Sequence, residues 1–416
     1  MTSPEQGRLA PLLARGEVAA LMATLNRDGE EARIVGGAVR NALLGEDVAD
    51  IDVATTALPE ETVRRAKAAG FKPVPTGIEH GTITVVVAGM PFEVTTLRRD
   101  VETDGRHAVV AFGRDFREDA LRRDFTINAL GLDADGALHD YAGGVGDLAA
   151  RRVRFIGQAR ERIAEDYLRI LRFFRFHARY GAGEPDKAAL EACTEGRAGL
   201  EGLSRERVRA ELLKLLAAPR AASTLRAMAG AGLLVPVIGG VPQLSRFEAM
   251  AGDGEKGGDR VHPDFRLAAL AVLTREDAAR LREKLRLSNA ESGRIEAIAL
   301  ALETVSGRES LPALAELRET AHRVGTDAVA AALVLLNATA GAARAEEGQT
   351  LIAGLGQTPR FLPSGKDLLA LGVAAGPLLG QVLEQARSDW ITAGCPAGRD
   401  EQMALVAKAA AMLSPA

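Results

Sequence analysis

Residues 34–56 read IVGGAVRNALLGEDVADIDVATT, and this stretch decides the fold of the first part of the chain. An apolar run ends at Val35, two glycines follow, and a helical pattern begins. Glycine lets the backbone approach a ligand closely, and the first N–H groups of a helix are free to bind an anion. Arg40 lies one turn into the expected helix, where it adds a positive charge. The stretch therefore predicts a phosphate-binding turn at Gly36 and Gly37.

Two carboxylates follow ten residues later. Asp50 and Asp52 flank Ile51 at the start of the next expected strand, and alternation along a strand puts both on one face. They would repel one another unless a cation lies between them, and Mg²⁺ shared with substrate phosphates is the usual solution. The same spacing recurs at residues 133–135, where Gly136 indicates a hairpin turn instead of a metal site. The preceding glycine turn singles out Asp50 and Asp52.

Residues 32–155 mix short β-branched runs with turn signals and helical stretches. This pattern predicts a small α/β domain with a mixed or antiparallel sheet. Hairpin turns are expected at residues 88–91 and 135–136. Glu93 lies on a neighbouring expected strand, either as a third acidic metal ligand or as a solvated edge residue.

From Gln158 onward the strand signal disappears, so the fold class is α+β, an α/β head followed by an all-α part. The best breaks between helices are residues 252–263 and 341–365, which are rich in Gly and Pro. We expect a catalytic head at 1–157, a helical neck at 158–251 and a helical body and tail at 252–416. Helical patterns cover residues 158–181, 204–217, 219–231, 264–286, 290–304, 311–323, 326–339, 366–388 and 400–413.

Two further stretches carry charged residues in suggestive patterns. Residues 118–133, EDALRRDFTINALGLD, place Arg122, Arg123 and Asp124 together. Two Arg before an Asp can bracket a nucleotide, with guanidinium on phosphate and carboxylate on ribose hydroxyls. An unremarkable surface ion pair is the alternative.

Residues 164–181, AEDYLRILRFFRFHARYG, repeat a charge every third residue on one apolar helix. The band consists of Asp166, Arg169, Arg172 and Arg175. Arg in such a helix needs an anionic partner, either a ligand phosphate or a buried structural carboxylate. Asp166 and Arg169 side by side would match a base edge with an amino donor and a ring acceptor, which cytosine and adenine share.

Composition narrows the class of protein. The hydrophobic fraction is 47% and the net charge is −4, so the chain is globular and does not coat nucleic acid indiscriminately. Residues 151–181 nevertheless hold nine Arg against three acids, a patch that suits a phosphate-bearing ligand. Two cysteines, Cys193 and Cys395, exclude a disulfide scaffold and fit a reducing cytoplasm. No apolar run is long enough to span a membrane, so no membrane partner is expected.

Taken in order, these motifs resemble the tRNA nucleotidyltransferase and bacterial poly(A) polymerase family, the class II CCA-adding enzymes. Residues 34–56 look like the phosphate loop and metal motif of this family. One departure is Asn41, where the family usually has Asp, and we expect only a local change in hydrogen bonding. The other stretches that are similar to family motifs are 96–112 (flexible segment), 122–129 (ribose motif), 140–148 (connector), 165–176 (base-selecting helix), 204–216 (neck helix) and 365–390 (tail).

The resemblance implies catalytic residues and Mg²⁺ ligands at Asp50 and Asp52, with Glu93 as a candidate third ligand. It also implies tRNA as partner, gripped at its acceptor and T arms by the helical part, with CTP and ATP as substrates; monomer and dimer stay open. Together with the residue patterns, it gives nucleotide contacts at Gly36, Gly37, Arg40, Arg122, Arg123, Asp124, Asn128, Asp166, Arg169, Arg172 and Arg175.

The activity implied is addition of C, C and A to tRNA 3′ ends. An enzyme that adds only A, or a poly(A) polymerase, shares the head motifs, but poly(A) polymerases often carry basic terminal extensions, and residues 404–416 here are not basic. An alternative of another class is a catalytically silent RNA-binding protein that kept the fold. The intact Asp50 and Asp52 argue against it.

Overall fold

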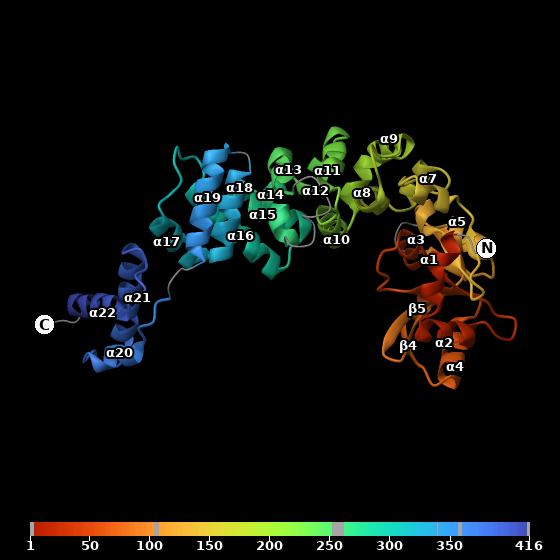
Figure 1. The fold of residues 1–416 in the computed structure, drawn as a ribbon, viewed down its shortest axis with the longest axis horizontal. Coiled ribbons are helices and arrows are strands. Elements are labelled where there is room, and N and C mark those ends of the chain that lie inside the picture. The colour runs from red at the N-terminus through yellow and green to blue at the C-terminus, as the bar shows by residue number, and fades with distance from the viewer. Residues whose placement is uncertain (1–3, 104–107, 252–261, 339, 357–359, 414–416) are drawn as a thin grey trace. The chain divides into compact units, whose positions relative to one another are not determined.

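A computed structural model describes residues 4–103, 108–251, 262–338, 340–356 and 360–413 (Figure 1). By its internal contacts the chain divides into two compact units. Unit 1 comprises Met1–Leu203 with Gly230–Leu233, and unit 2 comprises Ser204–Ala229 with Leu234–Ala416. The predicted α+β class is confirmed, because the strands lie in unit 1 and the described part of unit 2 is helical. The boundaries at 157 and 251 stay predictions.

Unit 1 contains a seven-stranded mixed sheet with the strand order β3-β4-β5-β2-β1-β8-β9. Strands β2 and β5 pair in parallel, and the other neighbours in this sheet pair antiparallel. Both predicted hairpins are confirmed, since β4 turns into β5 and β8 into β9. The strands of the sheet are β1 (Ala32–Val35), β2 (Asp52–Thr55), β3 (Lys72–Gly77), β4 (Thr82–Val87), β5 (Met90–Thr96), β8 (Leu130–Leu132) and β9 (Leu138–Asp140).

Two further strands, β6 (Arg98–Thr103) and β7 (Ala108–Phe112), form a separate antiparallel pair. They fall in the segment that resembles the flexible part of the family, and residues 104–107 between them lie outside the described structure. Beyond the named strands, an isolated antiparallel bridge joins Phe125 and Phe155.

Helices lie between the strands of unit 1 in the sequence and also follow the last strand, β9. The helices of unit 1 are α1 (Pro4–Leu13), α2 (Gly16–Leu25), α3 (Gly37–Leu44), α4 (Pro59–Ala68), α5 (Phe116–Leu121), α6 (Gly144–Ala149), α7 (Ala159–Glu165), α8 (Leu168–Tyr180) and α9 (Lys187–Glu195). Sequence patterns predicted one helix over 158–181, and this was wrong at Asp166. There the backbone is extended, and the Asp166 carboxylate accepts the N–H of Leu168, as a residue that caps a helix start does.

An aromatic cluster joins the sheet region to α8. The ring centroids of Phe125 and Phe155 lie 4.9 Å apart, and those of Phe155 and Phe173 lie 5.7 Å apart. All three side chains are buried. Burial of rings of this size is a large part of core stability, so α8 is held firmly against the head.

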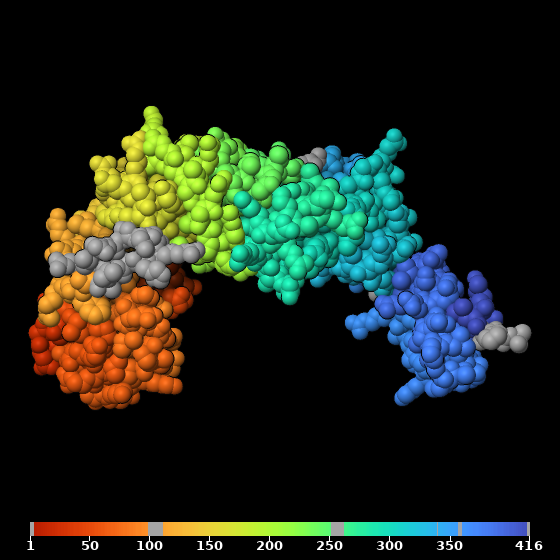
Figure 2. Space-filling view, turned by 180° about the vertical axis from the view of Figure 1, so that it is seen from behind, coloured from red at the N-terminus to blue at the C-terminus, as the bar shows by residue number. Residues whose placement is uncertain are grey.

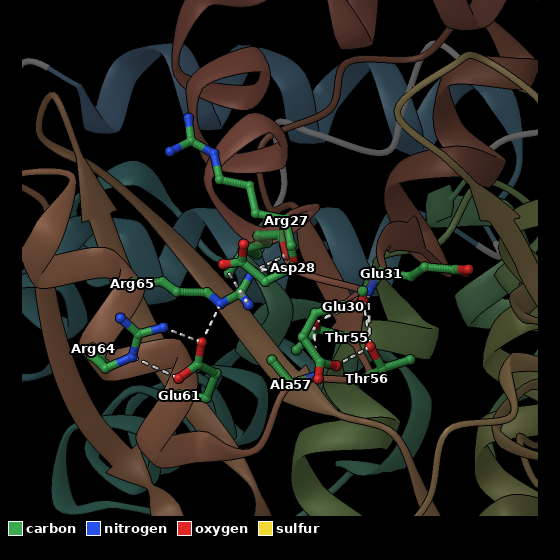
Figure 3. A network of polar contacts seen from close by, with 12 residues as sticks. Arg27, Asp28, Glu30, Glu31, Thr55, Thr56, Ala57, Glu61, Arg64 and Arg65 are labelled. Atoms are coloured by element: carbon green, nitrogen blue, oxygen red, sulfur yellow. Dashed lines mark hydrogen bonds and ion pairs between the residues drawn. The ribbon is translucent and has the colours of Figure 1, made fainter.

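A polar network fixes one end of β2 (Figure 3). The Thr55 hydroxyl donates to the Glu31 carbonyl, and the Thr56 hydroxyl donates to the Glu30 carboxylate. From α4, the buried Arg65 pairs with Glu61 and donates to backbone carbonyls at the end of α2 and just after it. These contacts fix the C-terminal end of β2, so Asp52 at its N-terminal end also has a defined position.

The described part of unit 2 consists of helices and their connections. Its helices are α10 (Arg205–Leu216), α11 (Ala221–Gly230), α12 (Leu234–Ile238), α13 (Leu244–Ala251), α14 (Pro263–Ala271), α15 (Arg275–Leu285), α16 (Asn289–Val305), α17 (Leu314–Val324), α18 (Thr326–Asn337), α19 (Ala342–Leu355), α20 (Gly365–Ala370), α21 (Pro377–Thr392) and α22 (Arg399–Leu413). Helices α20 to α22, blue in Figure 2, share a small core of their own around Leu368 and Val382. None of the described helices has the length and apolar character needed to cross a bilayer.

Three predicted boundaries in unit 2 are wrong. The pattern over 264–286 is two helices, because Thr274 and Asp277 form a capping box that starts α15. The pattern over 366–388 is also two helices, since Pro377 starts α21 after a glycine turn. The break predicted at 341–365 contains α19, in which Gly348 faces Asn337 so closely that a Cβ would lie 1.6 Å from Nδ2. Most of the break at 252–263 lies outside the described residues.

Candidate nucleotide and metal site

The glycine turn ends β1 and starts α3. Gly36 adopts a φ of +70°, which favours glycine, and its N–H donates to the Leu130 carbonyl. Two guanidinium groups lie against this turn. A Cβ at Gly36 would lie 3.0 Å from Nη1 of Arg123, and one at Gly37 would lie 3.5 Å from Nη2 of Arg40. The turn therefore combines a helix N-terminus with two cations, an arrangement suited to phosphate.

The acidic group lies at the start of β2. Asp52 is the register partner of Glu93 in the parallel strand β5 and of Val35 in β1. Asp50 precedes it by two residues, with Ile51 buried between them. Thus the structure brings Glu93 beside the predicted pair, while its role as a metal ligand stays a prediction.

The pKa of the Asp52 carboxyl is raised, although the side chain reaches solvent. Partial desolvation by the surrounding protein is the largest cause, followed by the negative charge of Glu93 and a smaller contribution from Asp50. The positive charge of Arg123 opposes the shift. A cation placed at these carboxylates would relieve the repulsion.

Asp52 and Glu93 line an open hollow of about 330 Å³. Residues of β1 and β2 line it as well, as do Arg98, Arg122 and Arg123. Acidic and basic side chains thus line one space that could admit a triphosphate. Among the described residues, no three His, Cys, Asp or Glu side chains are grouped as a ready-made metal cage. Two carboxylates completed by substrate phosphates fit a hard divalent cation, since such ions prefer oxygen donors and keep open positions.

The predicted ribose motif forms two ion pairs in the structure. Asp119 accepts from Nε and Nη2 of Arg122 at 2.9 and 2.6 Å and from Nη2 of Arg123 at 3.2 Å. Burial alone would raise the pKa of Asp119, but the two guanidinium groups hold it below its ordinary value. Asp119 therefore aims both Arg side chains toward the hollow.

Asp124 is buried, and both of its oxygens are engaged. Oδ1 accepts from the N–H of Phe125 and from Nδ2 of Asn128, and Oδ2 accepts from Nε of Arg172 at 2.7 Å. Burial works against ionisation, but Arg172 and Asn128 keep the pKa of Asp124 below its ordinary value. Of the two partners that the sequence left open for Arg172, the structure shows the structural carboxylate.

The stretch predicted to select the base spans the junction of α7 and α8. Asp166 lies between the helices, while Arg169, Arg172 and Arg175 follow on α8. Nη1 of Arg169 pairs with Glu165 and donates to the Arg162 carbonyl. The two residues predicted to read the base are thus near neighbours, and Glu165 holds the guanidinium of one of them.

The sequence patterns missed three residues of this site. Asp119 lies three and four residues before Arg122 and Arg123, so helical spacing could have revealed it. Glu165 precedes Arg169 by four residues, which is the same signal. Tyr180 contacts Arg40 although the two are 140 positions apart in the sequence, and no local sequence pattern predicts this contact.

Comparisons with known proteins agree with this geometry. The mouse (Mus musculus) mitochondrial CCA tRNA nucleotidyltransferase 1 is 35% identical over 396 residues, which cover 92% of this chain and 88% of the mouse protein. The chain belongs to the CCA tRNA nucleotidyltransferase family. A CCA-adding enzyme of Streptococcus pyogenes is 42% identical over about half of each chain.

Two regions of the chain match family models. Residues 32–154 match the poly A polymerase head domain, and residues 184–247 match a probable RNA- and SrmB-binding site of polymerase A. The crystal structure of the Bacillus stearothermophilus CCA-adding enzyme in complex with CTP is 26% identical, with a TM-score of 0.72 and 99% coverage of both chains. The glycine turn, the carboxylates and the Asp124 contacts with Asn128 lie in the matched head. The residues 166–175 lie between the two matched regions.

Proposed function

We propose that this chain adds C, C and A to the 3′ end of tRNA, with CTP and ATP as substrates. One observation carries the proposal: a glycine turn flanked by Arg40 and Arg123 lies beside the carboxylates of Asp52 and Glu93 in one head domain. This set can hold a triphosphate and a divalent cation next to each other. The relatives that match most of the chain are named for this activity.

The chain's own groups supply binding and orientation. The N–H groups at the start of α3, with Arg40 and Arg123, receive the triphosphate, because backbone donors and guanidinium groups both match phosphate oxygens. The RNA 3′-oxygen attacks the α-phosphorus, a new P–O bond forms, and the bond to the β-phosphate breaks so that pyrophosphate leaves. Such a transfer depends mainly on positioning and charge stabilisation.

We propose Mg²⁺ as the cation, held by Asp50 and Asp52 with Glu93 as the third carboxylate. Bound there, Mg²⁺ would supply charge neutralisation for the phosphates and a lowered pKa for the attacking hydroxyl. The fit rests on the oxygen-only donor set and on the position of Glu93 beside Asp52, where its negative charge adds to desolvation in raising the pKa of Asp52.

Base choice is proposed to rest on Asp166 and Arg169. An ionised Asp accepts and an Arg donates, so together they match the amino donor and ring acceptor of cytosine and adenine. Uracil and guanine present a carbonyl beside a ring N–H and would leave these groups unpaired.

We further propose three domains. The head covers residues 1–157, the neck covers 158–251, and the body and tail, which bind tRNA, cover 252–416.

Sequencing the 3′ ends made from a tRNA that lacks CCA, with all four NTPs present, tests the proposal. Ends that read CCA support it. Ends that read only A, or a run of A, would assign the chain to an A-adding enzyme or a poly(A) polymerase. If the ends are unchanged while tRNA binding is retained, the chain is a catalytically silent RNA-binding protein.

We propose the cytoplasm as the compartment, because the chain has few cysteines. Cell fractionation tests this against the mitochondrion, for which the mouse relative is named.

A further inference from the structure

Arg40 is buried in the head, and four of the five N–H groups of its guanidinium donate to acceptors. Nε and Nη2 donate to Oδ1 of Asn41 at 3.1 and 2.9 Å, and Nη1 donates to Oδ1 of Asn128 at 2.5 Å. Nη2 also donates to the hydroxyl of Tyr180 at 2.8 Å. All three partners are neutral, and among the described residues no carboxylate is hydrogen-bonded to this buried cation. Burial is the largest influence on Arg40 and lowers its pKa.

Tyr180 contacts Arg40 in two ways. Its hydroxyl accepts from Nη2 and lies 3.4 Å from Oδ1 of Asn41, to which it can donate. Its ring centre lies 4.1 Å from the guanidinium carbon, within the range of a cation–π interaction. The ring therefore supports the guanidinium, and the hydroxyl fixes its rotation.

The contacts continue to the far side of the site. The amide of Asn128 bridges Arg40 and Asp124, and Asp124 pairs with Arg172. Tyr180 and Arg172 both belong to α8, so the series starts and ends on the same helix. We call Tyr180, Asn41, Arg40, Asn128, Asp124 and Arg172 the Arg40 network. It connects the phosphate turn to two points on α8 that are eight residues apart.

We propose that Tyr180 and Asn41 are positioning residues, which hold the guanidinium of Arg40 beside Gly37 so that it meets the triphosphate. The inference rests on the proposed function. An arginine without these partners would have several rotamers and would lose side-chain entropy when the nucleotide binds. The network fixes the side chain in advance, so less entropy is lost when the nucleotide binds.

CTP and ATP carry the same triphosphate, so a change that displaces the Arg40 guanidinium must raise KM equally for both nucleotides. Tyr180→Phe removes the hydroxyl and keeps the ring. We expect KM to rise about tenfold for CTP and for ATP, the effect of one hydrogen bond to a charged group, with little change in kcat. The preference for C and A over U and G should be retained, because Asp166 and Arg169 are unchanged.

Asn41 provides a matched pair of variants. Asn41→Leu removes the acceptor, and we expect the same equal rise in both KM values. Asn41→Asp keeps an acceptor at the same place, so KM should remain within about twofold of the wild type. An Asn41→Asp enzyme as impaired as Asn41→Leu would overturn the role of the acceptor.

A double-mutant cycle shows whether Tyr180 acts through Arg40. In an Arg40→Ala background, Tyr180→Phe should cause no further rise in KM. Tyr141→Phe is the control, since the Tyr141 hydroxyl accepts from Arg33 outside the network. A full additional rise in the Arg40→Ala background would overturn the proposal. So would a lowered melting temperature with unchanged KM, or a rise in KM for only one nucleotide.

Calorimetric titration with CTP separates this inference from the proposed function. If the wild type adds no nucleotide to tRNA but binds CTP, the proposed reaction is wrong, and weaker binding by Tyr180→Phe still supports the positioning role. Equal binding by the two proteins would overturn it. A wild type that neither reacts nor binds CTP would overturn both.

Discussion

Asp52 and Glu93 are register partners in the parallel strands β2 and β5. Paired residues in neighbouring strands extend to the same face of a sheet, so two carboxylates that are 41 positions apart in sequence share one side of the hollow. Their repulsion contributes to the raised pKa of Asp52. Two neighbouring carboxylates of this kind on central strands are stabilised when a cation binds between them.

Asp52→Ala should lower the rate of nucleotide addition by several orders of magnitude, roughly the contribution of a metal that stabilises transition-state charge. Binding of tRNA should persist, because the helical unit is untouched. Asp135→Ala is the matched control: it belongs to a second Asp-x-Asp, in the turn between β8 and β9, where Asp133 accepts backbone N–H groups. Single-turnover rates and a gel-shift titration measure both effects. Near-normal turnover of Asp52→Ala would show that Asp52 is not a ligand of the metal.

Gly36→Ala should weaken nucleotide binding as well as stability. The new Cβ would lie 3.0 Å from Nη1 of Arg123, and the φ of +70° adds strain of about 1 to 2 kcal/mol. Gly70→Ala provides the comparison, since Gly70 has a φ of +78° and open space around its Cβ position. Both variants should lose similar stability in chemical denaturation, but only Gly36→Ala should show a raised KM for CTP. Equal KM values would place the triphosphate elsewhere.

Arg172→Ala should reduce the free energy of unfolding by roughly 2 to 3 kcal/mol, because buried Asp124 loses its charged partner. We expect weaker use of the nucleotide as well, if Arg172 also neutralises triphosphate. Arg160→Ala breaks an exposed pair with Glu195 and should leave stability almost unchanged, because solvent screens this pair. Urea denaturation and CTP binding are the measurements. A stable Arg172→Ala protein would show that Asp124 is satisfied without it.

Asp166→Ala and Arg169→Ala should lose discrimination against UTP and GTP more than they lose catalysis, because the metal and phosphate groups remain. A site built for specific hydrogen bonds can reject a mismatched base by about 10⁴-fold. Arg169→Ala should also lose affinity through the missing charge. The measurement is incorporation of each single NTP on tRNA ending before the first C and after the second. If both variants keep the preference for CTP and then ATP, base choice lies in other residues.

Acid should destabilise the head through Asp119. Its pKa is lowered in the folded protein from an ordinary 3.8, so the stability that it contributes is present above that pH and is lost as the pH falls through the folded value. Asp119→Asn should therefore be less stable at neutral pH and less sensitive to pH as the pH falls below 3.8. Denaturation curves at several pH values measure this slope. The exposed Asp135→Asn should keep the wild-type slope.

Much of the site follows from local sequence. The glycine pair after Val35, the acid spacing around Ile51 and the Arg122–Asp124 run specify a turn, a strand start and a short charged segment, and the structure has each at its predicted place. Such patterns work because backbone preferences and the two-residue repeat of a strand act over a few residues. Helix boundaries were less accurate: Asp166 ends a helix because its side chain can cap the next one, which overrides the apolar repeat.

The tertiary structure decided which distant groups meet. Glu93 comes beside Asp52 only through the order and register of β5 and β2, and Tyr180 reaches Arg40 only because the packing of α8 places its end at the start of α3. The sequence determined the chemical types available, acids for a cation and arginines for phosphates. Contacts across 41 or 140 residues depend on how the sheet and helices assemble. That assembly minimises exposed apolar surface over the whole domain, and no local pattern encodes it.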